Sequence, residues 1–293
     1  MATTAQDVFE STTATIVRAI EEGAGSWSMP WARDGLAFPV NPTTRKHYRG
    51  GNVLALMAAG LVAGWECGEW ATYKQWTSIG AQVRKGERGT GCVFWNVTQD
   101  RTTVEEDNNG DPVELVSFPR FRARAFVVFN AAQVDGYEPT PPARNTDAQI
   151  TEADAFFTRV GAVVEHRSEG RAYYSPATDL IVLPRFEAFT DAPAYYATSA
   201  HEHAHWTGYP TRLGRDLTNR FGDDAYAAEE LIAELSAAFT CAALGISTTP
   251  RLDHAGYLAH WLRVLRADPR ALFTVAGKAQ AATDHLRSLA EEG

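Results

Sequence analysis

Three prolines within four residues interrupt the chain just before its midpoint, at Pro139-Thr140-Pro141-Pro142. Proline fixes φ and has no amide hydrogen, so this stretch can continue neither a helix nor a central strand. Short proline-rich stretches act as stiff spacers between folded units. The sequence therefore predicts two domains, residues 1–142 and 147–293, and a length of 293 residues is compatible with two.

The composition is that of a folded protein, with 45% hydrophobic and 22% charged residues. No stretch of about 18 consecutive apolar residues is present, so we expect no transmembrane helix and no membrane partner. The first residues lack the basic and then apolar pattern of a secretory signal. The three cysteines, Cys67, Cys92 and Cys241, are odd in number and far apart. They argue against a disulfide scaffold and predict a reducing, cytoplasmic setting.

Hydrophobic periodicity predicts an α+β fold. We expect the first half to contain helices near residues 8–20 and 53–61, strands at 92–97 and 120–129, and an acidic loop at 105–111. The second half should contain a small sheet followed by a helical bundle. Its expected elements are a helix at 147–160, strands at 162–166, 172–174 and 180–183, and helices near 192–206, 224–244, 254–265 and 269–290.

Residues 201–205 read His-Glu-His-Ala-His, so that His201, Glu202 and His205 form an H-E-x-x-H motif. On a helix, side chains four residues apart lie on one face, so both imidazoles can reach one tetrahedral zinc ion. The glutamate beside the first histidine can then act as a general base on a water molecule. His203 projects to another side of such a helix, and we expect it to be a surface or packing residue.

A catalytic zinc ion usually has three protein ligands, so a third is expected downstream. The segment Glu230-Leu-Ile-Ala-Glu234 is similar to the E-x-x-A-[D/N] pattern of metalloproteases whose third ligand is a glutamate. This likeness implies that Glu230 binds the metal and that Glu234 orients His201. Glu229 points about 100° away around the same helix and is the alternative third ligand.

Charge is distributed unevenly, with 14 Lys and Arg against 16 Asp and Glu in residues 1–146 and 13 against 20 in the remainder. Basic clusters in the first half are interleaved with aromatic residues, a combination that binds single-stranded nucleic acid through phosphate contacts and base stacking. The alternative is a solvated basic face over an ordinary aromatic core. Trp27 and Trp31 are further stacking candidates. The predicted DNA-binding residues are Arg45, Lys46, Tyr48, Arg49, Trp76, Arg84, Lys85, Arg88, Arg122 and Arg124.

Short motifs in both halves resemble those of ArdC-type antirestriction proteins. In the first half they are Tyr48-Arg-Gly-Gly-Asn52, Gln82-Val-Arg-Lys-Gly-Glu-Arg-Gly89 and Val128-Phe-Asn130, similar to the N-terminal single-stranded-DNA-binding domain of that family. In the second half they are Tyr195-Tyr-Ala-Thr198, the H-E-x-x-H, Trp206-Thr-Gly208, Arg220-Phe-Gly-Asp223 and Glu229 to Glu234, similar to its zincin-like metallopeptidase domain.

The resemblance implies a protein of a plasmid or other mobile element that protects incoming DNA from host restriction during conjugation. It also implies binding of single-stranded DNA without strong sequence preference, and a zincin-like peptidase domain. Our first hypothesis is that this peptidase acts on a host protein near the bound DNA. One departure is His203, where the family usually has a large apolar residue. This departure leaves another divalent metal such as Mn²⁺ open beside Zn²⁺.

Two other functions remain open on the sequence. In one, the protein only binds DNA or protein and its metal is structural. In the other, it is a metalloprotease toxin or regulator with a protein-binding N-terminal half. Glu202 argues against a purely structural metal, because such a site has no need of a general base.

Overall fold

The computed structural model of the chain describes residues 4–22, 38–65, 67–98, 103–106, 112–115, 120–140, 147–168, 170–216, 224–246, 265–266 and 268–293. Several predicted features lie outside these residues. They are Trp27, Trp31, residues 107–111 of the acidic loop, the motif at 220–223 and, apart from Leu265, the helix near 254–265.

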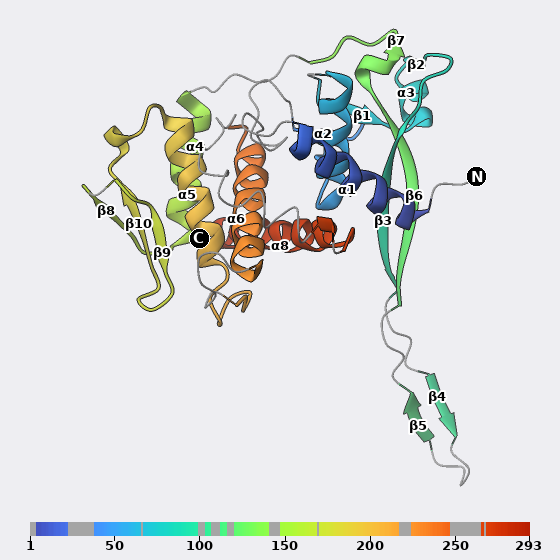
Figure 1. Cartoon of the computed structure of the whole chain (residues 1–293). Helices are drawn as coiled ribbons and strands as arrows, with labels where there is room; N and C mark the ends of the chain where they lie inside the picture. Colours follow the sequence, from blue (N-terminus) through green and yellow to red (C-terminus); the bar gives the residue numbers. More distant parts are fainter. Residues whose placement is uncertain are drawn as a thin grey trace.

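A long antiparallel strand pair, β3 (Thr90–Thr98) and β6 (Arg120–Asn130), forms the axis of the N-terminal half (Figure 1). Helices α1 (Ala5–Glu22) and α2 (Gly51–Ala63) pack beside it. Shorter elements complete this half: β1 (Trp70–Ala71), α3 (Tyr73–Ser78), β2 (Gln82–Val83), β4 (Thr103–Glu106), β5 (Pro112–Leu115), the 3-10 turn Ala131–Gln133 and β7 (Val134–Asp135).

Strand pairing in this half joins segments that are far apart in sequence. One sheet has the order β1-β6-β3, and β2 pairs with β7. The β4–β5 hairpin extends beyond the far end of the β3–β6 pair (Figure 1). Helix α3 begins at a capping box in which Thr72 accepts a hydrogen bond from the Gln75 amide.

The C-terminal half places a small mixed sheet beside a group of helices. The central strand is β10, whose sequence Leu-Ile-Val-Leu-Pro is mostly buried; it pairs in parallel with β8 and antiparallel with β9. The elements are α4 (Asp147–Val160), β8 (Val164–Arg167), β9 (Tyr173–Ser175), β10 (Leu180–Pro184), a 3-10 turn (Phe186–Ala188), α5 (Ala192–Trp206), α6 (Asp224–Ala243) and α8 (Ala271–Glu292).

Helix α5 carries the H-E-x-x-H motif, and its ends are set by local sequence. Asp191 caps the first turn by accepting a hydrogen bond of 2.8 Å from the Ala194 amide, and Pro193 occupies that turn, where no amide donor is needed. At the other end the Gly208 amide donates to the His205 carbonyl over 2.8 Å. The helix is therefore fixed immediately beyond the second motif histidine.

Helix α6 lies between the two halves (Figure 1). The largest buried hydrophobic cluster joins side chains of α1, α2 and β3 with others of α6 and α8, so it crosses the predicted boundary. The α6 residues in this cluster include Leu231, Leu235 and Phe239. The helix that carries the three candidate glutamates therefore also forms the interior between the halves.

The prediction of an α+β fold is confirmed, and the predicted helices at 53–61, 147–160, 192–206 and 224–244 correspond to α2, α4, α5 and α6. The sequence did not predict β1, β2 and β7, because strands of two residues show no periodicity and exist only through distant partners. Among the described helices, none combines the length and apolarity that a membrane span requires.

Candidate metal centre and basic surface

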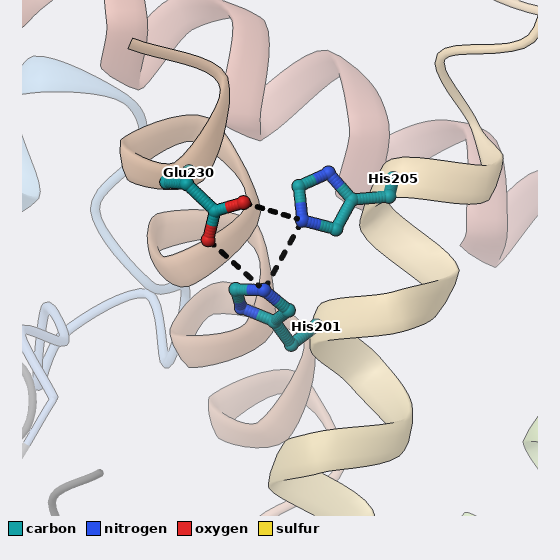
Figure 2. A group of neighbouring side chains, drawn as sticks. All are labelled: His201, His205 and Glu230. Carbon is teal, nitrogen blue, oxygen red and sulfur yellow. Dashed lines mark hydrogen bonds and ion pairs between the residues drawn. The ribbon is translucent and has the colours of Figure 1, made fainter. Parts of the chain in front are cut away.

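Helices α5 and α6 bring two histidines and one glutamate together at the contact between them. His201 and His205 project from successive turns of α5, and Glu230 projects from α6 toward both imidazoles (Figure 2). The two Nε2 atoms are 3.1 Å apart. The Glu230 carboxylate lies 3.6 Å from His201 Nε2 and 3.5 Å from His205 Nε2. All three ligand atoms lie within 4.8 Å of one another.

These separations fit the donor set of a tetrahedral metal ion. Ligand atoms at zinc–nitrogen and zinc–oxygen distances of about 2.0–2.1 Å are separated by about 3.3 Å when the geometry is tetrahedral. The two Nε2 atoms are 3.1 Å apart, and each lies 3.5–3.6 Å from one oxygen of the Glu230 carboxylate, Oε1 for His205 and Oε2 for His201, so each separation is close to that value. Two imidazoles and one carboxylate also form a donor set that leaves a coordination position for water in catalytic zinc sites.

A second pair of carboxylates faces the other nitrogen of each imidazole. His201 Nδ1 lies 3.1 Å from Glu234 Oε1, and His205 Nδ1 lies 3.2 Å from Glu229 Oε1. Glu229 and Glu230 therefore lie on opposite sides of the His205 ring. Only Glu230 is on the side where the two Nε2 atoms converge, so Glu230 rather than Glu229 has the position of a third ligand.

Glu229 is itself fixed by Arg215, a residue that the sequence analysis did not identify. Arg215 Nε and Nη2 each donate to the Glu229 carboxylate over 2.9 Å. Arg215 lies in the loop between α5 and α6, 14 residues before Glu229, where no spacing rule connects the two. Only the folded loop reveals this contact.

Burial and the neighbouring charged groups shift the pKa values of the site residues in opposite directions. Burial lowers the pKa of His205, but hydrogen bonds to Glu229 and Glu230 outweigh it and raise that pKa to about 10. Burial raises the pKa of Glu230, but hydrogen bonds to His201 and His205 hold it well below its usual value. The carboxylates thus favour a positive charge at this point, supplied either by a proton or by a metal ion.

Glu202 follows His201 on α5 and is only 4% exposed. Its carboxylate has no hydrogen-bond or ion-pair partner among the described residues. It lies near enough to His205 to contribute to the raised pKa of that residue. Within the described part of the chain, Glu202 is therefore a buried carboxylate that is not used in a hydrogen bond or ion pair and lies next to the first motif histidine.

His203 is a packing histidine. It is fully buried, its Nδ1 lies 2.7 Å from the Ser199 carbonyl oxygen, and its ring contacts Phe157 of α4. Burial lowers its pKa to about 4. Its Nε2 has no hydrogen-bond partner within the described part of the chain.

The predicted basic residues separate into paired and free side chains. Arg49 pairs with Asp284 of α8, Arg84 pairs with Glu87 and Asp135, and Arg45 lies 4.0 Å from Glu69. Four exposed cations have no side-chain partner among the described residues: Lys46, Lys85, Arg88 and Arg124. The backbone of Arg122 lies in β6, and its side chain is outside the described part.

The prediction that Trp76 and Tyr48 offer aromatic faces to DNA is corrected by the structure. Trp76 is fully buried and its indole nitrogen donates to the Phe129 carbonyl over 2.9 Å. Tyr48 is partly buried, and its hydroxyl donates to the Trp70 carbonyl over 2.9 Å. Both rings pack in buried clusters, and their polar atoms bind the backbone, Tyr48 that of β1 and Trp76 that of β6.

An exposed aromatic residue on the strand pair was not among the predicted residues. Phe94 of β3 is 59% exposed and lies directly opposite Arg124 in the register with β6. Cross-strand pairs share one face of a sheet, so an aromatic ring and a free guanidinium are neighbours there. The sequence of the N-terminal half contains many aromatic residues, and its pattern does not distinguish this exposed phenylalanine from the buried ones.

Comparisons with known proteins place both halves in one family. Residues 6–129 match the N-terminal domain of anti-restriction factor ArdC, and residues 151–278 match the zincin-like metallopeptidases. The uncharacterized protein y4eC of Sinorhizobium fredii (strain NBRC 101917 / NGR234) is 45% identical over 97% of this chain and 93% of its own length. The DNA primase TraC of Escherichia coli is 38% identical over 92% of this chain, which spans about a quarter (26%) of the primase.

Two crystal structures of the antirestriction ArdC protein from plasmid R388 are similar over nearly the whole length. The metal-free structure is 37% identical with a TM-score of 0.75, and 98% of each chain is covered. The Mn(II)-bound structure is 36% identical with a TM-score of 0.71, covering 97% of this chain and 98% of the other. The chain therefore belongs to the family of ArdC antirestriction proteins, with a zincin-like metallopeptidase domain in its C-terminal half.

Proposed function

We propose that the zincin-like half is a divalent-metal-dependent peptidase that acts in antirestriction on a host protein near the incoming DNA. The observation that supports this most strongly is the convergence of ligand atoms of His201, His205 and Glu230 within 4.8 Å, with the buried Glu202 next to His201 on α5. A site that only stabilised the fold would have no use for that carboxylate.

His201, His205 and Glu230 would hold the metal ion, and Glu202 would take part in proton transfer. The bound ion would supply a Lewis acid that polarises a peptide carbonyl and makes water more acidic. Glu202 would accept a proton from water and return it to the leaving amine. Glu234 and Glu229 would keep the imidazoles in the tautomer that presents Nε2.

The donor set favours zinc, because two histidines and one glutamate are a common zinc peptidase site. The R388 relative has been crystallised with Mn(II), which makes manganese the second candidate for this chain. Titration of the metal-free protein with each ion, followed by metal analysis after dialysis, would distinguish them. We expect one tightly held ion per chain.

The peptidase proposal is tested by Glu202→Gln, with Glu187→Gln, an exposed glutamate of the same half, as the control. Glu202→Gln keeps the ligands, so it should retain the metal ion and lose hydrolysis of a denatured protein substrate. Antirestriction should be lost with it during conjugation into a restricting host. If Glu202→Gln retains the metal and protects the incoming DNA fully, hydrolysis is not the mechanism and a binding function is supported instead.

We further propose that the N-terminal half binds single-stranded DNA in the cytoplasm of the recipient cell. Lys46, Lys85, Arg88 and Arg124 are exposed and have no ion-pair partner in the described ranges, so they would contact phosphates, and Phe94 would offer a face for base stacking. The similarity to the DNA primase TraC is compatible with this role.

A fluorescence-anisotropy titration with matched single- and double-stranded oligonucleotides tests the DNA proposal. Lys85→Ala/Arg88→Ala should weaken binding and lower its salt dependence, because each lost phosphate contact lowers the slope by about one. Arg171→Ala/Arg185→Ala, two exposed cations of the other half, is the charge-matched control. Metal binding without any DNA binding would instead favour a protease with a protein-binding N-terminal half.

Phe94→Ala tests the stacking residue separately. Loss of one stacked base costs about 1–3 kcal/mol, so the affinity for single strands should fall about 5- to 160-fold. Phe186→Ala removes an exposed ring of the other half, 45% exposed, and should leave the affinity unchanged. Equal affinities of Phe94→Ala and the wild type would remove Phe94 from the interface.

A further inference from the structure

A buried arginine, Arg215, holds the loop after the H-E-x-x-H helix against the C-terminal end of that helix. The Arg215 side chain is 8% exposed. Its Nη2 donates to the Ala204 carbonyl over 2.6 Å, and its Nη1 donates to the Thr207 hydroxyl over 2.9 Å. Two backbone hydrogen bonds, from Leu213 to Thr207 and from Arg215 to Gly208, hold the loop in the same place.

The same guanidinium fixes the carboxylate that contacts His205. Nε and Nη2 of Arg215 both donate to Glu229, and Glu229 Oε1 in turn lies 3.2 Å from His205 Nδ1. A planar guanidinium determines both the position and the orientation of a carboxylate, which a lysine cannot do. The direction of His205 Nε2 is therefore linked to the position of Arg215 through one intermediate residue.

Arg215 also balances charge where carboxylates are concentrated. Glu202, Glu229, Glu230 and Glu234 are all largely buried around the two histidines. Arg215 forms an ion pair with Glu229 in this group. Without it, Glu229 would be a buried carboxylate whose remaining partner is the imidazole that must bind the metal.

We infer that Arg215 is a positioning residue that sets metal affinity at His205 by holding Glu229. The inference rests on the proposed metal site. Arg215 does not touch the three ligand atoms, so its effect passes through the Glu229 carboxylate. Partners of metal-binding histidines typically account for about 10- to 100-fold in metal affinity.

The test measures zinc affinity by competition with a chelator, and the visible absorption of the cobalt-substituted protein. Arg215→Met should bind zinc about 10- to 100-fold more weakly and change the cobalt spectrum, because His205 is no longer held in one orientation. Arg215→Lys should lie between Arg215→Met and the wild type. A folded Arg215→Met with wild-type affinity and spectrum would overturn the inference.

A neighbouring arginine provides the matched control. Arg212 is 13% exposed, pairs with Asp179 and lies over the Trp206 ring, so it is comparably buried in the same loop but does not contact the glutamates. Arg212→Met should lower stability while leaving zinc affinity within about twofold. Equal losses of affinity in Arg212→Met and Arg215→Met would show that loop stability, not Glu229, is responsible.

A double-mutant cycle keeps the inference testable if Arg215→Met folds poorly. In the Glu229→Gln background the ion pair is already lost, so Arg215→Lys should produce little further loss of affinity. Additive losses would contradict action through Glu229. Failure of the wild type to bind any divalent ion would overturn the proposed metal site itself, and this inference with it. Wild-type binding with unchanged Arg215 variants would overturn only the inference.

Discussion

The ring of Phe38 lies edge-on against that of Phe239, with 5.8 Å between the centroids and 78° between the planes. Phe38 belongs to the N-terminal half, and Phe239 to α6 of the zincin-like half. Close by, the Gly50 amide donates to the Gln280 side chain of α8 over 3.2 Å. The two halves therefore share an interior, and the helix with the metal-site glutamates is part of it.

Phe239→Ala should destabilise both halves together. Removal of a buried phenylalanine costs about 3–5 kcal/mol, and Phe239 is 4% exposed in the shared cluster. Urea unfolding followed by tryptophan fluorescence, which reports mainly on the N-terminal half, and by far-ultraviolet circular dichroism should give one coincident transition, shifted to lower urea. Two separate transitions, with only one shifted, would show that the halves unfold independently.

Zinc affinity should rise with pH, because the ion must displace a proton from His205. In the metal-free protein the pKa of His205 is raised to about 10, above the value of 6.5 for an unperturbed histidine. Protonated His205 therefore stabilises the metal-free fold below pH 6.5, and this contribution is lost as the pH rises through about 10.

We expect zinc affinity to increase about tenfold per pH unit between about pH 7 and 9, where one proton is released per ion bound. Calorimetric titrations in buffers of different ionisation enthalpy would count that proton directly. The affinity of Glu229→Gln should depend less on pH, because the hydrogen bond from His205 to a carboxylate is gone. A pH-independent affinity in the wild type would contradict the raised pKa.

His203 should make the protein sensitive to acid. Burial lowers its pKa to about 4, whereas the unfolded chain binds a proton near 6.5. The contribution of neutral His203 to stability is therefore complete above pH 6.5 and is lost as the pH falls toward 4.

His203→Leu removes this sensitivity and the buried Nε2 without a partner. With both proteins metal-free, the wild type should lose about 2 kcal/mol more than His203→Leu between pH 7.5 and 5. Urea unfolding at the two pH values measures this difference. Equal losses in the two proteins would show that His203 is protonated in the folded state.

The sequence predicted those parts of the metal site that depend only on the geometry of a single helix. The spacing of His201 and His205 requires only a helix, and the predicted helix near 192–206 corresponds to α5. The choice between Glu229 and Glu230 depends on how α6 is rotated against α5. That rotation is set by packing between distant segments: one face of α6 packs on Ala197 and Ala200 of α5, and another lies in the shared cluster with α1, α2 and α8. A local sequence pattern therefore does not determine it.

In the N-terminal half, the sequence did not distinguish exposed aromatic residues from buried ones. Trp76 and Phe94 both occur in aromatic segments, yet one is fully buried and the other is 59% exposed. Trp76 is buried because α3 packs its ring beneath β6, where the indole meets the Phe129 carbonyl. Two residues before Phe94 on the same face of β3, Cys92 is buried in a cluster with Leu56 and Trp70, and Phe94 is not part of that cluster. Both outcomes follow from strand pairing over long distances.

Cysteine reactivity should follow burial in the folded protein. Burial raises the pKa of Cys92 and of Cys241 to about 12, and it also raises the pKa of the less buried Cys67. The thiolate is the reactive form, so near pH 8 Cys92 and Cys241 should not react with a disulfide reagent, and Cys67 should react slowly. In urea, all three thiols should react rapidly. Cys67→Ser should abolish the native reaction while two thiols still react in urea. A rapid native reaction in this variant would show that the buried clusters around Cys92 or Cys241 open on the time scale of labelling.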